Sequence, residues 1–377
     1  MNPTDLIGPS SPLGYPAPYW FLVFFKALGF TLHMVPMNLW YAGLLLAMLL
    51  GWRGGEEAKR WSGRLMRQMP IIVALGVNFG IVPLLFTQVA YYKVFYPATI
   101  LMAWPWFAII ALLTLAYYGV YLYAGGLKEN GARMTSLRRV AGWISAVLFI
   151  AIGFFFSNGF SLMTNLGAWP QLWQSTSVGG APLGIALNTG DPTLWPRWLM
   201  MFGLALTTVA AYTVLDAGLF AKKESEAYQS WAGGFALKLY TVGVVWFALS
   251  ASWYVWGTWP ADLRAQMLGS GIFILTALTA LSPGLSWLLI AAQRRGVTWV
   301  MALLTAFAQF GVLALNAVSR QIVQNIELTK FLDVTAEPVH MQWSPLIVFL
   351  LLFVAGIIVL IWMIGKVVRA AEQPITR

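Results

Sequence analysis

Long apolar stretches alternate with short polar segments along the whole chain. Each stretch holds about 20 apolar residues or more, enough for a helix to cross the hydrocarbon core of a bilayer. The pattern predicts nine membrane spans at residues 18–50, 69–91, 101–125, 139–163, 195–220, 236–257, 266–292, 297–319 and 344–366. We therefore expect an all-α, polytopic membrane bundle in which residues 1–377 form a single membrane domain.

Composition supports the membrane assignment and excludes several cofactors. Hydrophobic residues make up 59% of the chain and charged residues only 10%, too few charges to cover a soluble surface. The chain has no cysteine, which excludes a Cys-ligated iron–sulfur cluster and a covalently attached haem c. The first 15 residues lack a basic n-region, and we expect the first span to insert without a cleaved signal peptide.

Lysine and arginine gather in alternate connections between the spans. One side holds 17 of the 23 basic residues, namely Arg53, Lys59, Arg60, Arg64, Arg67, Lys128, Arg133, Arg138, Arg139, Lys222, Lys223, Lys238, Arg294, Arg295, Lys366, Arg369 and Arg377. Cytoplasmic loops carry such an excess. The N-terminus is therefore predicted outside and the C-terminus in the cytoplasm, in a cytoplasmic (inner) membrane. The net charge of +10 then reports orientation, and lipids rather than nucleic acid are the expected contact.

His33 lies midway along the first predicted span. An ionisable group at that depth needs a partner and is a candidate functional site. Neutral imidazole is a common axial ligand of haem b, but hydrogen bonding to a neighbouring helix explains the residue equally well. Lys26 is seven residues earlier on the same helix face, where it either meets a haem propionate or reaches outward to the interface.

The remaining polar residues of the spans are few. His340 precedes the ninth span, where an ordinary interfacial histidine is favoured. Asp216 is the one acid clearly inside a span, either a cytoplasmic proton entrance or a hydrogen-bonded carboxylate at a helix end. Asn316, Arg320 and Gln321 lie toward the outer side, where they suit a quinone or propionate site as well as interhelical hydrogen bonds.

Five short motifs follow one another along the chain. They are HMVP at His33–Pro36, GVNFG at Gly76–Gly80, YYGVY at Tyr117–Tyr121, SNGFSLM at Ser157–Met163 and SRQIV at Ser319–Val323. In this order they resemble subunit I of the cytochrome bd quinol oxidases. That family has nine spans, an outside N-terminus and a haem-ligating histidine in its first helix, so the resemblance implies that His33 binds haem b.

The chain also departs from the family. No Asp or Glu lies between residues 58 and 128, where the family carries carboxylates for its high-spin haems and proton entry. The fifth-helix histidine falls in a segment that has Met200 instead, and Met267 corresponds to a seventh-helix methionine ligand. The long quinol-binding loop is reduced to a turn at 259–265. We therefore expect a chain that is not a functional oxygen reductase by itself.

The resulting hypothesis is a bd-like membrane subunit of a respiratory electron-transfer complex. It would carry about one haem b, a quinone, or both. No metal is expected beyond the haem iron. The haem-ligand candidates are His33, Met267, Met200 and His340, and the candidates for a quinone or propionate site are Lys26, Asn316, Arg320 and Gln321.

The expected partners are other subunits of a membrane complex, including a periplasmic multihaem or c-type cytochrome that would dock on the outer connections 164–194 and 320–343. The alternative is a cofactor-free anchor for redox subunits. A transporter is less favoured because no internal repeat is visible, and a quinol-interacting anchor of a molybdoenzyme does not explain the ordered motifs.

Overall fold

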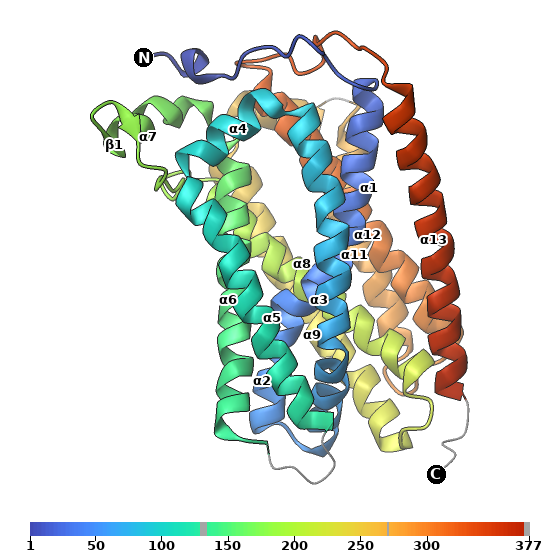
Figure 1. The fold of residues 1–377 in the computed structure, drawn as a ribbon. Helices are drawn as coiled ribbons and strands as arrows, with labels where there is room; N and C mark the ends of the chain where they lie inside the picture. The colour runs from blue at the N-terminus through green and yellow to red at the C-terminus, as the bar shows by residue number, and fades with distance from the viewer. Residues whose placement is uncertain (129–133, 270, 373–377) are drawn as a thin grey trace.

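The computed structural model describes residues 1–128, 134–269 and 271–372, so Arg133 and Arg377 of the charge pattern lie outside the described residues. Within that part of the chain, nine helices are long and apolar enough to cross a membrane. The two termini lie at opposite ends of the bundle (Figure 1), as an odd number of spans requires. The prediction of an all-α polytopic membrane bundle is confirmed.

The spans are built from helices that in three cases continue through a π-helical turn. The spanning elements are α1 (Tyr19–Asn38) with a π turn (Leu39–Gly43) and α2 (Leu44–Arg53), α3 (Glu56–Ala90), α5 (Ala103–Lys128), α6 (Ser136–Leu162), α8 (Leu194–Leu215) with a π turn (Asp216–Phe220), α9 (Glu226–Ser252) with a π turn (Trp253–Thr258), α11 (Phe273–Ala292), α12 (Trp299–Leu328) and α13 (Trp343–Glu372).

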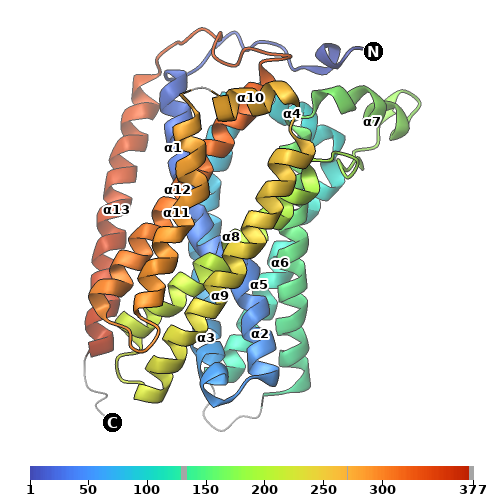
Figure 2. The same ribbon diagram turned by 180° about the vertical axis from the view of Figure 1, so that it is seen from behind.

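Short elements gather at the end of the bundle that carries the N-terminus (Figures 1 and 2). They are α4 (Tyr92–Leu101), α7 (Trp169–Ser175), α10 (Ala261–Gly269), two 3-10 turns (Pro3–Leu6 and Leu166–Ala168) and the antiparallel strands β1 (Ser177–Val178) and β2 (Ala181–Pro182). By the charge pattern this is the outer side.

Four predicted boundaries differ clearly from the structure, and one of them is the start of the sixth span, where α9 begins at Glu226 rather than at 236. The second span starts at Glu56 rather than at 69, because Glu56 and Glu57 stabilise a helix N-terminus and start the helix before its apolar part. Residues 261–269 form the separate helix α10, so Met267 lies outside the seventh span. The helix α12 continues to Leu328, so Arg320 and Gln321 lie inside a helix and not in an outer loop at 320–343.

The helix α1 lies at the centre of the bundle, packed against α3, α8 and α12. At the other extreme, α13 stands at the edge of the bundle (Figure 1), where Phe349 and Phe353 pack on Phe25 with ring centroids 5.0 and 5.3 Å apart. The centre of the fold therefore positions the residues of α1, including His33.

Two glycines let α8 and α9 approach closely. A methyl group on Gly203 would lie 2.7 Å from the backbone nitrogen of Phe247, and one on Gly243 would lie 2.9 Å from the nitrogen of Thr207. Small residues at helix crossings allow the close packing that stabilises membrane bundles.

We expect Gly203→Ala to destabilise the protein by about 1–3 kcal/mol, because backbone atoms cannot move aside without separating the two helices. The loss would appear as a lower unfolding temperature in detergent. The matched control is Gly234→Ala in α9, where an added methyl group meets nothing within 4 Å. An equal fall in both variants would contradict the packing argument.

Candidate cofactor site

A cavity of about 380 Å³ lies between α1, α3, α5, α6 and α12, and we call it the His33 cavity. Its volume is within the range of small-molecule and cofactor pockets, about 300–1,000 Å³. Most of its wall is apolar, from residues such as Ile109, Leu113, Phe149 and Ile152. Its polar lining comes mainly from α1 and α12, including Lys26, His33, Ser157, Arg320, Gln321 and Gln324.

The imidazole of His33 is held by one backbone contact. Its Nδ1 lies 2.7 Å from the carbonyl oxygen of Gly76 on α3. A carbonyl oxygen only accepts hydrogen bonds, so Nδ1 carries the proton and the lone pair is on Nε2. Nε2 has no hydrogen-bond partner among the described residues, and the ring lines the cavity.

Gly80 makes room for this ring. A methyl group on Gly80 would lie 2.8 Å from Cε1 and 2.9 Å from Nδ1 of His33. The GVNFG motif thus supplies a carbonyl that orients the ring and, one turn later, a residue without a side chain that the ring packs against. The sequence shows both glycines but cannot show that they face His33.

Lys26 is partnered by amide groups at one end of the cavity. Its Nζ donates to Oε1 of Gln321 at 2.7 Å and to Oε1 of Gln324 at 2.9 Å, and lies 4.4 Å from the ring centre of Tyr91. Gln321 in turn donates to the hydroxyl of Tyr91. Burial and the adjacent Tyr19 raise the pKa of Tyr91, so its hydroxyl stays protonated.

Arg320 has a different environment. Its guanidinium lies between the rings of Phe30 and Phe160, at 4.9 and 5.1 Å from their centres. No hydrogen bond or ion pair joins it to another described residue. It lines the His33 cavity and also a second cavity of about 170 Å³, which we call the guanidinium cavity because Arg197 lines it too.

The structure brings some of the predicted site residues together and separates others. Lys26, His33, Arg320 and Gln321 share the His33 cavity, while Met200 and Asn316 line the guanidinium cavity.

Met267 is fully buried in a cluster with Tyr254, Trp259, Leu263 and Val323 and lines neither cavity. His340 is exposed on the outer side, with Nδ1 3.1 Å from the carbonyl oxygen of Leu13. Met267 and His340 therefore do not meet His33 in this arrangement.

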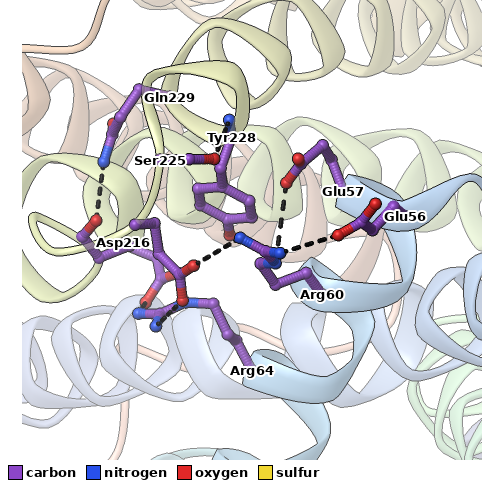
Figure 3. A network of polar contacts seen from close by, with 10 residues as sticks. Glu56, Glu57, Arg60, Arg64, Asp216, Ser225, Tyr228 and Gln229 are labelled. Atoms are coloured by element: carbon purple, nitrogen blue, oxygen red, sulfur yellow. Dashed lines mark hydrogen bonds and ion pairs between the residues drawn. The ribbon is translucent and has the colours of Figure 1, made fainter.

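Asp216 belongs to an ion-pair network at the inner end of the bundle, shown in Figure 3. Its carboxylate accepts from Nε and Nη2 of Arg64 at 2.8 and 2.9 Å. Glu224 links the same guanidinium to Arg60, at 3.3 and 3.2 Å. Asp216 lines none of the described cavities, so its position fits a hydrogen-bonded carboxylate at a helix end rather than a proton entrance.

Comparisons with known proteins relate the chain to one fold. No protein-family model and no curated protein sequence matches it. The solved structure of the bd oxidase from Geobacillus thermodenitrificans superposes with a TM-score of 0.64, over 96% of this chain and 100% of that chain, with 13% identical residues. At this identity the similarity shows a shared fold. The chain therefore has a bd-oxidase-like fold, and the chemistry of its cavities is argued from its own residues.

Proposed function

We propose that this chain is the membrane subunit of a respiratory electron-transfer complex and carries electrons through a b-type haem held by His33. The orientation of His33 is the observation that carries the proposal. Its Nδ1–H is fixed by the Gly76 carbonyl and its Nε2 lone pair is left for a ligand inside an apolar hollow. A metal-ligating histidine typically donates its other N–H to a carbonyl or carboxylate in this way.

The other residues of the cavity fit the same group. A haem, when bound, supplies reversible one-electron oxidation and reduction. The apolar walls from α5 and α6 would exclude water from its faces, and the guanidinium of Arg320 would pair with a propionate. Lys26 contributes positive charge at the same wall while its own hydrogen bonds go to Gln321 and Gln324.

The cavity does not favour oxygen reduction, which needs protons as well as electrons. No Asp or Glu is among the described residues that line the His33 cavity. Asp216, at the inner end of the α8 span, is bound by Arg64, and Glu327, in α12, lines a separate outer cavity and not this one. An electron carrier that exchanges electrons with other subunits, among them a periplasmic cytochrome on the outer face, is therefore the better proposal.

A quinone in the same cavity is the second candidate. The observation that favours it is the pair of donors on its wall, Lys26 and Gln321, with Tyr91 behind them as the acceptor of the Gln321 amide. A quinone carbonyl needs such donors, and an ammonium group has a third N–H to offer.

The test is a dithionite-reduced minus oxidised visible spectrum of the purified complex, with a pyridine-haemochrome count per copy of this chain. We expect about one b-type haem for each copy, since one histidine is placed to ligate it. A complex without haem b would overturn the proposal. It would leave the cofactor-free anchor, or a quinone alone if lipid extracts contain it at one per chain.

A further inference from the structure

Two guanidinium groups lie in the outer half of the bundle without a carboxylate bound to them. Arg197, in the first turn of α8, and Arg320, in α12, line the same guanidinium cavity. Nη1 of Arg197 is buried and has no hydrogen-bond partner. Each guanidinium rests on aromatic rings instead, Arg197 on Tyr254 at 5.9 Å and Arg320 on Phe30 and Phe160.

Two positive charges in one small cavity repel each other and are expensive to bury. Arginine inside a membrane protein is normally paired or faces a functional pathway. The two acids whose charges act on Arg197, Glu327 and Asp191, line a separate outer cavity of about 490 Å³. Neither forms an ion pair within 4 Å of Arg197 or Arg320 among the described residues, and Oε2 of Glu327 is itself buried without a partner. The protein alone leaves this positive charge unmatched at close range.

The guanidinium cavity adjoins the His33 cavity. Phe30, Ser157, Met201 and Arg320 line both, so the side chain of Arg320 stands at the boundary between them. A ligand seated in the His33 cavity can therefore extend an acidic substituent past Arg320 toward Arg197. Guanidinium groups bind carboxylates through two parallel hydrogen bonds, which makes arginine suited to this task.

We infer that Arg197 and Arg320 together form a carboxylate-binding site that holds the propionates of the tetrapyrrole in the His33 cavity. This inference rests on the proposed function and adds to it a residue, Arg197, that no motif of the sequence singled out. The same two charges suit the phosphate of an anionic lipid. We favour the propionates because the site is continuous with the His33 cavity.

The test compares two probes that differ only in their carboxylates. Protein produced in haem-deficient cells is titrated with haemin and with haemin dimethyl ester, in which both propionates are esterified. We expect the wild type to prefer haemin by about 10–100-fold, the range of one or two charge-assisted hydrogen bonds. In the double variant Arg197→Gln/Arg320→Gln the preference should fall toward one, while the affinity for the ester stays unchanged and shows that the protein is folded.

The single variants separate the two residues. Arg197→Gln should lose part of the preference, and Arg197→Lys should keep more of it, because lysine retains the charge without the two-pronged geometry. The control is Arg264→Gln, on α10, which lines neither the His33 nor the guanidinium cavity and should leave both affinities unchanged.

The outcomes are distinct. Equal binding of the acid and the ester by the wild type would overturn the carboxylate site, point to a lipid phosphate or bridging water at Arg197, and leave the haem proposal standing. Binding of neither probe would overturn the proposed function and this site with it.

Discussion

Replacing His33 by alanine should remove b-type haem from the complex. Nε2 of His33 is the imidazole nitrogen that has no hydrogen-bond partner among the described residues, and His33 lines the cavity. Loss of an outer-shell partner of a metal ligand costs 10–100-fold in affinity, and we expect loss of the ligand itself to cost more than about 100-fold. The measurement is the pyridine-haemochrome count per chain, with the unfolding temperature in detergent as the check that the variant is folded.

The chain contains its own matched control for this experiment. His340 is the only other histidine, and it is exposed on the outer side, bonded to the backbone of Leu13 and Tyr15. His340→Ala should keep the full haem content. Retention of haem in a folded His33→Ala variant, or loss of haem in His340→Ala, would show that the axial ligand is not His33.

Hydropathy and charge were sufficient to predict the fold because each span carries its own signal. A stretch such as residues 139–163 must be helical in a bilayer whatever its neighbours are, since its backbone can be satisfied only within the segment. Helix ends were less predictable. The Arg-rich start of α3 is helical although it is not apolar, because its charges are paired across the inner end of the bundle.

The site was predictable only as far as one helix reaches. Lys26 and His33 are seven residues apart, and the structure places both on the wall of one cavity. The partners of Lys26, Gln321 and Gln324, are 295 and 298 residues away in the chain. Gly80, which packs against the ring of His33, and Arg197, which lines one cavity with Arg320, are also distant in the chain from these partners. Such contacts depend on how the helices pack and not on local sequence pattern.

The largest stability effect is expected at the Arg64–Asp216 pair. The side chain of Asp216 is 1% exposed and that of Arg64 is 18% exposed, so the two-pronged pair is shielded from water. The pair joins α3 to the π-helical turn that ends α8 (Figure 3). Asp216→Asn removes the negative charge and leaves the guanidinium buried beside a weaker acceptor. We expect a loss of about 3–5 kcal/mol in unfolding free energy, the range for breaking a buried pair.

The comparison that isolates this effect uses single and double variants measured by denaturant titration in detergent. The double variant Arg64→Met/Asp216→Leu, which replaces both charges by apolar groups, should recover most of the stability lost in Asp216→Asn, because no buried guanidinium then faces a neutral side chain and Glu224 keeps its pair with Arg60. The control is the surface pair Lys330–Asp262, which is also at 2.8 Å but has both side chains about half exposed. Asp262→Asn should change the stability little, because water screens the charges of this pair. A loss of stability in Asp216→Asn as small as that in Asp262→Asn would contradict this prediction. It would mean that water reaches Asp216, and a proton entrance would then explain this carboxylate better than the closed ion-pair network does.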